Sequence, residues 1–347
     1  MLNDTYKGKT VLVTGATGFK GSWLCIWLLK LGAKVIGFSS KEWDNTYVFD
    51  KAGLTTQIID IRGDIRDIIK LKEIVEKYKP EIVFHLAAQP IVRTSYDFPL
   101  ETLSVNMLGT LNVMECIKSY NFLKAGVMIT TDKVYKNKEI ENGYKEEDEL
   151  GGYDPYSSSK ACSEIIINSY RCSFVQQCKQ VASARAGNVV GGGDFSKDRL
   201  IPDCIRAIEK GEEIKIRAPH STRPWQHVVE PLYGYLMLGE KLLLGWGVGT
   251  AFNFGPELEN IVPVKDIVSK IGPWTDISDK NESKHETIKL SLSIKKAKSI
   301  LQWKPIWGID KTLQMTLDWY KRCKSEDVYI LCFKQIEEYE NEYKKTI

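Results

Sequence analysis

The stretch that decides the fold is Thr10-Val11-Leu12-Val13-Thr14-Gly15-Ala16-Thr17-Gly18-Phe19-Lys20-Gly21. Its first five residues are apolar or β-branched, which predicts a buried strand. Three glycines follow at intervals of three, a helical apolar pattern then runs to Gly32, and residues 34–38 predict a second strand. Such a βαβ unit brings backbone N–H groups and the positive end of a helix close to a pyrophosphate. The stretch therefore predicts a dinucleotide-binding domain.

The same alternation of strands and helices continues along the chain. Residues 81–88 form another apolar run, residues 105–119 predict a helix, and residues 127–135 predict a further strand. Continuous apolar strands are typical of a parallel sheet that is covered on both faces. We therefore expect an α/β fold, with a Rossmann-type doubly wound parallel sheet and a smaller C-terminal substrate-binding α/β domain. The dinucleotide-binding domain would comprise residues 1–188 and 224–256, and the smaller domain residues 189–223 and 257–347.

Composition excludes several classes of function. The 347 residues include 48 Lys and Arg against 45 Asp and Glu, a formal net charge of +3, so nucleic acid is not an expected partner. The eight cysteines show no C-x-x-C spacing and the four histidines no i, i+4 pair, which predicts reduced thiols and no metal site. We see no signal peptide and no apolar run of about 20 residues. We expect a cytoplasmic protein with no membrane span.

A candidate acid–base site lies in Tyr156-Ser157-Ser158-Ser159-Lys160. Asp154 can cap a helix that begins here, and Pro155 suits its first position. A spacing of four places Tyr156 and Lys160 on one helix face. The ammonium group of Lys160 would favour the phenolate and lower the pKa of Tyr156 from about 10 towards neutrality. Such a tyrosine could accept a proton from a sugar hydroxyl.

A second polar group, Thr131-Asp132-Lys133, follows the strand at residues 127–135. Ligands of open α/β sheets bind beyond the carboxyl ends of the strands, so these side chains are expected to face the same cleft as Tyr156 and Lys160. We interpret Thr131, Asp132, Lys133, Tyr156 and Lys160 together as the catalytic set.

The Gly-x-x-Gly-x-x-Gly pattern and the Tyr-x-x-x-Lys pattern resemble the extended short-chain dehydrogenase/reductase superfamily that acts on nucleotide sugars. Further similar blocks lie at residues 85–90, 185–189, 191–194, 198–203, 223–228 and 253–256. The resemblance implies NAD as cofactor. It also implies that Asp64 meets the adenine and that the turn at Ala87 and Ala88 passes close to the cofactor. The cofactor set implied in this way is Gly15, Thr17, Gly18, Phe19, Gly21, Asp64, Ile65, Leu86, Ala87, Ala88, Tyr156 and Lys160.

The end of the second strand leaves the form of the cofactor open. A NAD site usually has an acidic residue there for the ribose hydroxyls, whereas this chain has Ser39, Ser40 and Lys41. NADP is therefore not excluded.

Asp132 and Lys133 distinguish branches of the resemblance. Epimerases generally have a small residue at position 132, whereas 4,6-dehydratases have an Asp that protonates the departing C6 hydroxyl. Many dehydratases continue with Glu as the C5 base, while Lys133 matches the pattern of CDP-glucose 4,6-dehydratases. A lysine is a base only when neutral, so either Lys133 removes the C5 proton or it acidifies that proton electrostatically for another group. The sequence leaves both open.

The resemblance also implies a substrate set. Asn188 and Arg223 would contact the nucleotide diphosphate, for which a planar arginine fork is well suited. The glycine run at residues 191–193 would form a flexible loop over the sugar, and Asn106 would steady its helix or a catalytic water. The expected substrate residues are Gln89, Arg93, Asn188, Arg199, Leu200, Arg217, Arg223 and His227.

The activity expected from this resemblance is conversion of CDP-D-glucose to CDP-4-dehydro-6-deoxy-D-glucose, with internal hydride transfer through bound NAD. The product would serve deoxysugar biosynthesis for surface polysaccharide, and the protein would be a homodimer or a dimer of dimers. Three alternatives remain: a nucleotide-sugar 4-epimerase, a 4,6-dehydratase of another nucleotide sugar, and a cofactor-sensing regulator. Asp132 disfavours the first, Lys133 the second, and the complete catalytic set the third.

Overall fold

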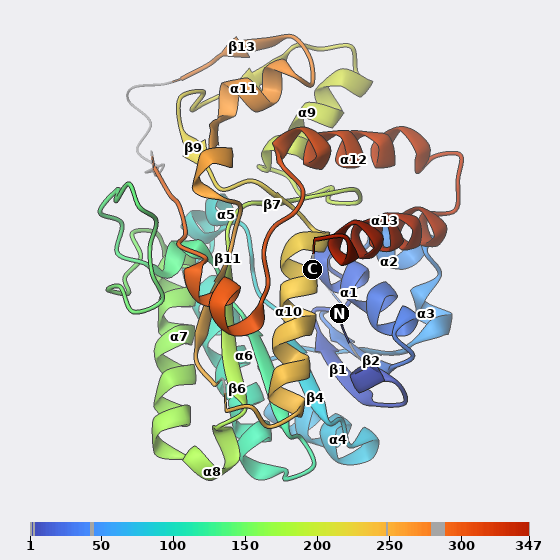
Figure 1. Cartoon of the computed structure of the whole chain (residues 1–347), viewed down its shortest axis with the longest axis vertical. Helices are drawn as coiled ribbons and strands as arrows, with labels where there is room; N and C mark the ends of the chain where they lie inside the picture. The colour runs from blue at the N-terminus through green and yellow to red at the C-terminus, as the bar shows by residue number, and fades with distance from the viewer. Residues whose placement is uncertain (1, 3, 42–44, 248, 279–288, 347) are drawn as a thin grey trace.

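A seven-stranded parallel sheet forms the centre of the molecule, with strand order β11-β6-β5-β4-β1-β2-β3 (Figure 1). The structure is a computed structural model that describes residues 2, 4–41, 45–247, 249–278 and 289–346. The strands are β1 (Thr10–Thr14), β2 (Lys34–Ser39), β3 (Ile59–Arg62), β4 (Ile82–His85), β5 (Ala125–Ile129), β6 (Val181–Ala186) and β11 (Ala251–Phe254). From β1 the chain adds β2 and β3 on one side, and it then adds β4 on the other side of β1, so the strand order reverses between β1 and β4. Ligands of doubly wound sheets bind at this switch point, beyond the carboxyl ends of the strands.

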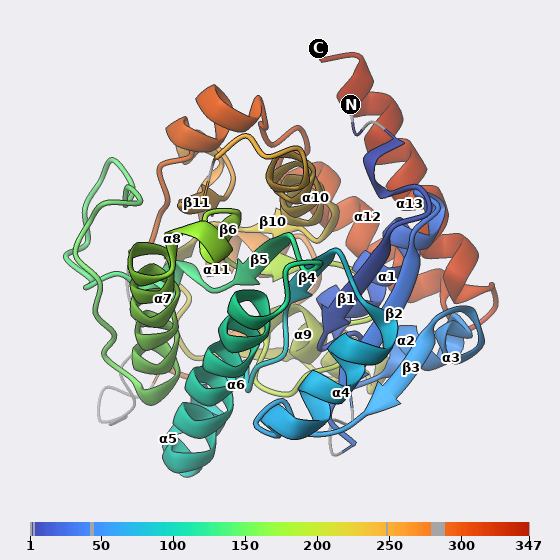
Figure 2. The same ribbon diagram turned by 90° about the horizontal axis from the view of Figure 1, so that it is seen from below.

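Helices cover both faces of the sheet, which confirms the predicted doubly wound fold. One face carries α1 (Phe19–Lys30), α10 (Val229–Leu243) and α13 (Val328–Lys344), and the other α4 (Ile68–Tyr78), α6 (Pro99–Ser119) and α7 (Pro155–Ser173). The helix expected at residues 105–119 begins earlier, because Pro99 occupies its first turn. Seen from below, α6 and α7 lie side by side (Figure 2). The other helices are α2 (Tyr47–Lys51), α3 (Leu54–Gln57), α5 (Val92–Asp97), α8 (Val175–Cys178), α9 (Leu200–Glu209), α11 (Val264–Ser269) and α12 (Ile309–Arg322).

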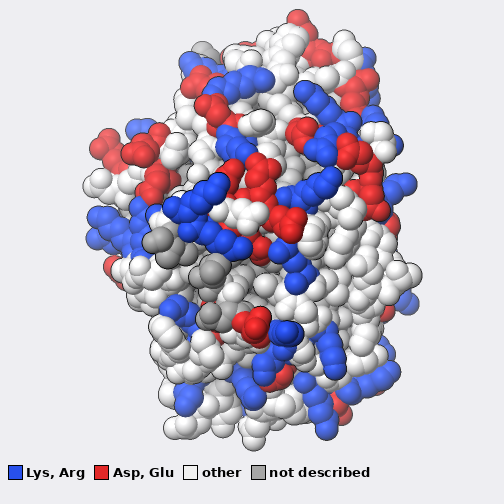
Figure 3. Space-filling view, turned by 45° about the vertical axis from the view of Figure 1, so that its right-hand side comes forward, with Lys and Arg blue, Asp and Glu red and all other residues white. Residues whose placement is uncertain are grey.

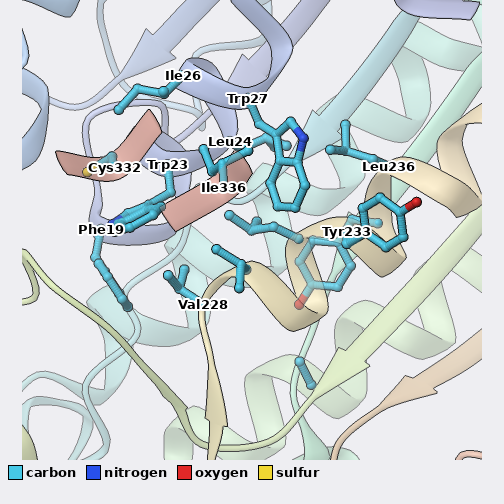
Figure 4. Packing of buried hydrophobic residues seen from close by; sticks show 14 of the residues in the cluster. Phe19, Trp23, Leu24, Ile26, Trp27, Val228, Tyr233, Leu236, Cys332 and Ile336 are labelled. Carbon is cyan, nitrogen blue, oxygen red and sulfur yellow. The ribbon is translucent and has the colours of Figure 1, made fainter. Parts of the chain in front are cut away.

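Alternating residues of each strand point into two separate cores. Val11 and Val13 of β1 pack with α1 and α10, whereas Leu12 of the same strand packs with α4 and α6. Figure 4 shows the first core, where Trp23 and Trp27 of α1 meet side chains of α10 and α13. Both tryptophans are fully buried. This large aromatic core fixes α1, and with it the glycine-rich turn that precedes α1.

Smaller elements lie above the carboxyl ends of the strands. They include α9, α11 and three two-stranded pairs, formed by β7 (Val189–Val190) with β10 (Gln226–His227), β9 (Thr222–Arg223) with β12 (Val262–Pro263), and β8 (Ile214–Ile216) with β13 (Trp274–Asp276). The C-terminal helix α13 lies instead against α1, where Trp27 Nε1 donates to Glu340 Oε1 at 2.7 Å. The expected division into two domains stays a prediction. Helix α13 belongs to the range expected for the smaller domain, yet it packs against α1 of the other expected domain.

The glycine run at residues 191–193 is packed rather than free. A Cβ atom at Gly192 would lie 2.0 Å from the ring of Trp319, and the Gly192 carbonyl accepts a hydrogen bond from Trp23 Nε1 at 2.9 Å. Trp319 belongs to α12 and is fully buried. The expected flexible loop is therefore wrong, because these glycines make room for an indole ring.

Charges of both signs are interspersed on the face drawn in Figure 3. Within the described ranges, no helix has the length and apolar character needed to cross a bilayer. The same residues contain no group of three or more His, Cys, Asp or Glu side chains that could hold a metal ion.

Candidate active site

The start of α7 holds the Tyr156 and Lys160 side chains in place. Asp154 Oδ1 accepts a hydrogen bond from the Ser157 amide at 2.8 Å, and Pro155 occupies the first turn. The predicted cap and helix start are thereby confirmed. One turn later, Lys160 Nζ donates to the Ile129 carbonyl at 3.2 Å, so the ammonium group lies at the end of β5.

Burial dominates the pKa values of this pair. It raises the pKa of Tyr156 to about 12, although a hydrogen bond with Thr131 and the charge of Arg199 act in the opposite direction. Burial also lowers the pKa of Lys160 to about 8, partly offset by Glu164. The expectation that Lys160 lowers the Tyr156 pKa towards neutrality is therefore wrong for the protein by itself, because desolvation of the phenolate outweighs Thr131 and Arg199, and the charges of Asp132 and Asp154 raise the pKa further.

Asp132 is a buried carboxylic acid at the centre of the site. Its side chain is 2% exposed, and Oδ1 accepts a hydrogen bond from Thr131 Oγ1 at 3.0 Å. Its other oxygen, Oδ2, has no hydrogen-bond partner among the described residues. Burial raises the pKa of Asp132, while the nearby Lys133, Thr131 and Arg223 lower it in part. A carboxyl group with a raised pKa and an unpartnered oxygen is suited to donate a proton.

A buried ion pair braces the helix beneath the catalytic groups. Glu164 of α7 accepts hydrogen bonds from Arg185 Nη2 and Ser183 Oγ at 2.8 Å, and from Thr130 Oγ1 at 2.5 Å. These contacts join α7 to β5 and β6, the strands that carry the rest of the site. Burial raises the pKa of Glu164, but Arg185 and the hydroxyl donors outweigh it and leave the pKa below the usual value.

Asn106 has a structural role rather than a contact with the cleft. It holds the segment after β4 by accepting from the Gln89 amide at 2.8 Å, and its Nδ2 donates to Ser159 Oγ of α7 at 2.8 Å. Of the two expectations for this residue, the structure supports the one in which it steadies its surroundings.

The first cavity, of about 640 Å³, contains the whole predicted catalytic set and most of the predicted substrate set. Its lining carries more cations than anions, which suits a diphosphate. The predicted residues in its wall are Thr131, Asp132, Lys133, Tyr156, Lys160, Arg93, Asn188, Arg199, Leu200, Arg217 and Arg223.

Several of these cations are already held by neighbours. Arg217 Nη1 lies 3.3 Å from Asp198, and Arg199 Nη1 lies 3.1 Å from Asp194. Arg223 donates to the Thr222 carbonyl at 2.9 Å and is mostly buried. Fixed guanidinium groups lose little side-chain freedom when they bind an anion.

Two residues of the predicted substrate set lie outside this cavity. Gln89 bonds with the Ile91 amide and with Thr102, so its amide holds its own loop. His227 is fully buried between the rings of Trp23 and Trp307, and burial lowers its pKa to about 3. Both side chains are packing or positioning groups in this structure, and the sequence pattern could not show that they face away from the cleft.

A second cavity, of about 520 Å³, lies over the glycine-rich turn. A Cβ atom at Gly15 would lie 2.7 Å from the Ala87 amide nitrogen, and one at Gly21 would lie 2.0 Å from the Gly15 carbonyl oxygen. The turn therefore requires glycine at both positions and leaves the start of α1 open to a phosphate. Its wall includes Gly15, Thr17, Gly18, Phe19, Gly21, Asp64, Ile65, Leu86, Ala87 and Ala88, while Tyr156 and Lys160 line the first cavity.

Sequence reasoning missed several cations that line these cavities, among them Lys20 and Arg62. Lys20 lies in the walls of both, and burial together with Arg199 and Lys160 lowers its pKa to about 7. Arg62, at the end of β3, lines the second cavity. Lys20 could have been predicted, because it directly precedes Gly21 of the glycine-rich turn. Arg62 could not, because its position beside the cavity depends on the register of β3 against β2.

The two cavities share wall residues, including Lys20, Leu86, Ala88, Asp194 and Arg199. A dinucleotide in the second cavity would thus adjoin a ligand in the first. The doubly wound sheet, the glycine-rich turn and the adjoining site with Tyr156 and Lys160 together define a Rossmann-type protein of the dinucleotide-dependent class.

The chain belongs to the GDP-mannose 4,6 dehydratase family, whose model matches residues 12–316. This finding confirms the resemblance to enzymes of nucleotide sugars. The CDP-glucose 4,6-dehydratase of Salmonella typhimurium is 43% identical over 96% of this chain and 97% of that protein. The dTDP-glucose 4,6-dehydratase of Haemophilus influenzae is 26% identical, over 89% and 97% respectively.

Solved structures show the same fold. The dTDP-glucose 4,6-dehydratase of Bacillus anthracis, solved in complex with NAD, has a TM-score of 0.76 and 22% identity, covering 91% of this chain and 97% of that one. The UDP-glucuronic acid 4-epimerase of Bacillus cereus has a TM-score of 0.79 and 23% identity, covering 90% and 99%. Dehydratases and epimerases share this architecture, so the fold does not separate the two reactions.

Proposed function

We propose that this chain is a CDP-glucose 4,6-dehydratase, which forms CDP-4-dehydro-6-deoxy-D-glucose by internal hydride transfer through NAD. The observation that carries the proposal is Asp132, a buried carboxylic acid in the same cavity as Tyr156 and Lys160. An epimerase has no hydroxyl to expel and needs no acid there. The preference for CDP-glucose is supported by the similarity to the CDP-glucose 4,6-dehydratase of Salmonella typhimurium.

In the proposed mechanism, the residues of the first cavity move three protons, those of the C4 hydroxyl, of Asp132 and of C5. When bound, NAD supplies a reversible hydride acceptor and a positive charge that favours the phenolate of Tyr156. Tyr156 accepts the proton of the C4 hydroxyl, and Thr131, its hydrogen-bond partner, orients the C4 oxygen. Asp132 donates its proton to the C6 hydroxyl as water leaves. Lys160 stays next to the end of β5 and stabilises the phenolate.

Lys133 lies in the wall of the first cavity, one residue beyond the acid. Its charge also lowers the pKa of Asp132 and so partly opposes burial. We propose that, once the C4 ketone has formed, the C5 proton moves either to neutral Lys133 or, acidified by the charge of Lys133, to another basic group of the cavity wall, and that the group which takes it later returns a proton to C5. Arg199, Arg217 and Arg223 would bind the diphosphate.

Mass spectrometry of the products tests this proposal. The purified chain is incubated with CDP-glucose and NAD, and in parallel reactions with dTDP-glucose, UDP-glucose and GDP-mannose. Loss of one water from CDP-glucose alone is the expected result. Unchanged mass together with a change of sugar stereochemistry would instead identify an epimerase, and water loss from another nucleotide sugar would replace the proposed substrate.

We also propose a cytoplasmic homodimer that pairs through α6 and α7. Exposed apolar side chains on these adjacent helices support it, since Leu108 is 45% exposed and Ile165 is 58% exposed. Light scattering should give the mass of a dimer for the wild type and of a monomer for Leu108→Glu combined with Ile165→Lys. Ile69→Glu, on α4, changes an apolar residue that is 70% exposed and lies outside this surface, and it should remain dimeric. A monomeric wild type would contradict the proposal.

A further inference from the structure

Lys20 lies where the two cavities meet. It is the second residue of α1, is partly buried, and lines both the first and the second cavity. The proposed reaction passes a hydride between a sugar in the first cavity and a dinucleotide in the second, so the nicotinamide end of the dinucleotide must lie at this junction. Lys20 therefore belongs to the wall at which the nicotinamide ring and the sugar come together.

The charge of Lys20 is not neutralised by its neighbours. Among the described residues, the other charged groups that both cavities share are Asp194 and Arg199, which pair with each other at 3.1 Å. Asp194 Oδ1 also accepts from Asn45 Nδ2 at 3.1 Å and from the Ser196 amide at 3.0 Å. Lys20 has no hydrogen-bond or ion-pair partner in the described part of the chain. Its amine is therefore available to a bound ligand.

The place of Lys20 in its helix is unfavourable for the helix itself. The N-terminus of a helix carries a partial positive charge, so a lysine in the first turn opposes the helix dipole. The first turn of α1 contains no acidic residue that would compensate for it. A cation at this position is therefore explained by what binds in the cavities rather than by the stability of α1. Two parts of a dinucleotide could meet it, the pyrophosphate and the nicotinamide.

The surroundings of the amine favour the nicotinamide. Lys20 Nζ lies 6.0 Å from the centre of the Tyr235 ring, which is fully buried on α10. Burial, with the charges of Arg199 and Lys160, lowers the pKa of Lys20 to about 7, while Asp132 raises it in part. The amine thus lies within electrostatic reach of Lys160 and Asp132, which belong to the catalytic set.

We infer that the Lys20 side chain contacts the nicotinamide ring and that its positive charge favours the reduced form of the bound cofactor. The oxidised ring carries a positive charge and the reduced ring does not, so an adjacent ammonium repels only the oxidised form. The hydride that reduces the ring is the one that the sugar gives up at C4, and Lys20 keeps its proton throughout. The inference rests on the proposed function only in placing a nicotinamide where the two cavities meet. It adds Lys20 to the catalytic set as the residue that eases oxidation at C4.

Binding measurements on the full chain test this inference without turnover. The probes are NAD, NADH and ADP-ribose, which lacks the nicotinamide, and calorimetry at pH 6 keeps the amine protonated, below its pKa of about 7. Lys20→Met should lower the ratio of the NADH affinity to the NAD affinity about tenfold, which equals about 30 mV for a two-electron couple. Binding of ADP-ribose should change less than about twofold.

Three further variants control for charge and folding. Lys20→Arg keeps the positive charge and should hold the ratio within about twofold of the wild-type value. Lys20→Gln, a second neutral variant, should repeat the loss seen with Lys20→Met. Lys30→Met removes a lysine at the other end of α1, where it pairs with Glu340 at 2.8 Å, and should change neither the ratio nor the binding of ADP-ribose.

The outcomes separate this inference from the function on which it rests. Equal weakening of NAD, NADH and ADP-ribose by Lys20→Met would place the amine on the pyrophosphate and overturn the inference. An unchanged ratio in both neutral variants would overturn it as well. The expected change of ratio, in a chain that leaves CDP-glucose unaltered, would support the contact of Lys20 with the nicotinamide and refute the dehydratase proposal. Failure of the wild type to bind either dinucleotide would contradict both.

Discussion

Burial, rather than a counter-charge, decides the direction in which the pKa of Asp132 is shifted. Asp132 lies within reach of the charges of Lys133 and Arg223, yet desolvation keeps its pKa above the usual value. Its sequence neighbours alone would suggest an ionised aspartate. The position of this side chain in the fold therefore raises its pKa, the direction that favours a proton donor.

Asp132→Asn should slow water loss strongly while preserving the first half of the reaction. We expect turnover to fall by about 10²–10⁴-fold, the usual contribution of a general acid. Oxidation at C4 would continue, so the near-ultraviolet absorbance of the reduced cofactor should appear on addition of CDP-glucose and persist. Stopped-flow absorbance checks this expectation.

The matched control for this variant is Asp203→Asn, which changes another carboxylate in the wall of the same cavity, one that is paired with Arg206. It should reduce turnover less than about threefold. Full water loss by Asp132→Asn would show that another group protonates the C6 hydroxyl.

At the scale of single elements, α7 links helix capping to catalysis. Asp154→Ala removes the bonds to the Ser157 amide and hydroxyl, which should cost about 1 kcal/mol of unfolding free energy. Because Tyr156 lies in the first turn, fraying there should also lower kcat. Urea unfolding and steady-state kinetics measure the two effects.

Asp327→Ala separates these two effects, because Asp327 caps α13 through the Ile330 amide at 3.0 Å, away from both cavities. It should cost a similar free energy with kcat unchanged. Equal kcat values for the two variants would show that the α7 cap has no role beyond stability.

Elements with strong local signals could be predicted from the sequence. The glycine-rich turn, the cap of α7 and the strand at residues 10–14 follow from short-range chemistry, and the structure confirms them. Most of the predicted cofactor residues line the second cavity, but that set came from the family resemblance rather than from local chemistry, and its role stays a prediction. Arg62 escaped prediction because its place beside Ser39 depends on the register of two strands. His227 was misplaced because its burial depends on Trp307, eighty residues further along the chain.

At the scale of the whole molecule, the buried Glu230 joins α10 to the C-terminal segment. Its carboxylate accepts from the Ile306 and Trp307 amides and from the Tyr339 hydroxyl. Desolvation outweighs these donors and raises the pKa of Glu230 to about 7, from a usual value of 4.5. Between these two pH values the unfolded chain is ionised at this position while the folded chain retains its proton.

Stability should therefore decrease as the pH rises from about 4.5 to about 7. Below pH 4.5 both states hold the proton, so the contribution is fully present, and it is lost as the pH passes the folded pKa. A shift of this size corresponds to roughly 3 kcal/mol. Denaturant unfolding as a function of pH should show this slope in the wild type and a smaller one in Glu230→Gln. Identical slopes would contradict the raised pKa.

The packing of Trp319 against Gly192 predicts an effect of a distant helix on substrate binding. Gly192→Ala forces a methyl group into the indole ring and should destabilise the chain by about 1–3 kcal/mol, the usual result of overpacking. Because residues 190 and 191 line the first cavity, the KM for the nucleotide sugar should also rise. Gly211→Ala, at an open position with φ +70°, strains the backbone without such a clash and should leave KM unchanged. An unaltered KM in Gly192→Ala would show that the loop and the helix are independent.

The contact between Gly192 and Trp319 also has an evolutionary consequence. The buried Trp319 ring fills the space that a side chain at position 192 would need. A larger residue at position 192 can therefore be accommodated only if the residue at position 319 becomes smaller. Lineages of this family should therefore exchange these two residues as a pair, and a chain that keeps the tryptophan should keep the glycine. The order of such exchanges would be constrained as well, because shrinking the ring first leaves a cavity, whereas enlarging the glycine first creates a clash.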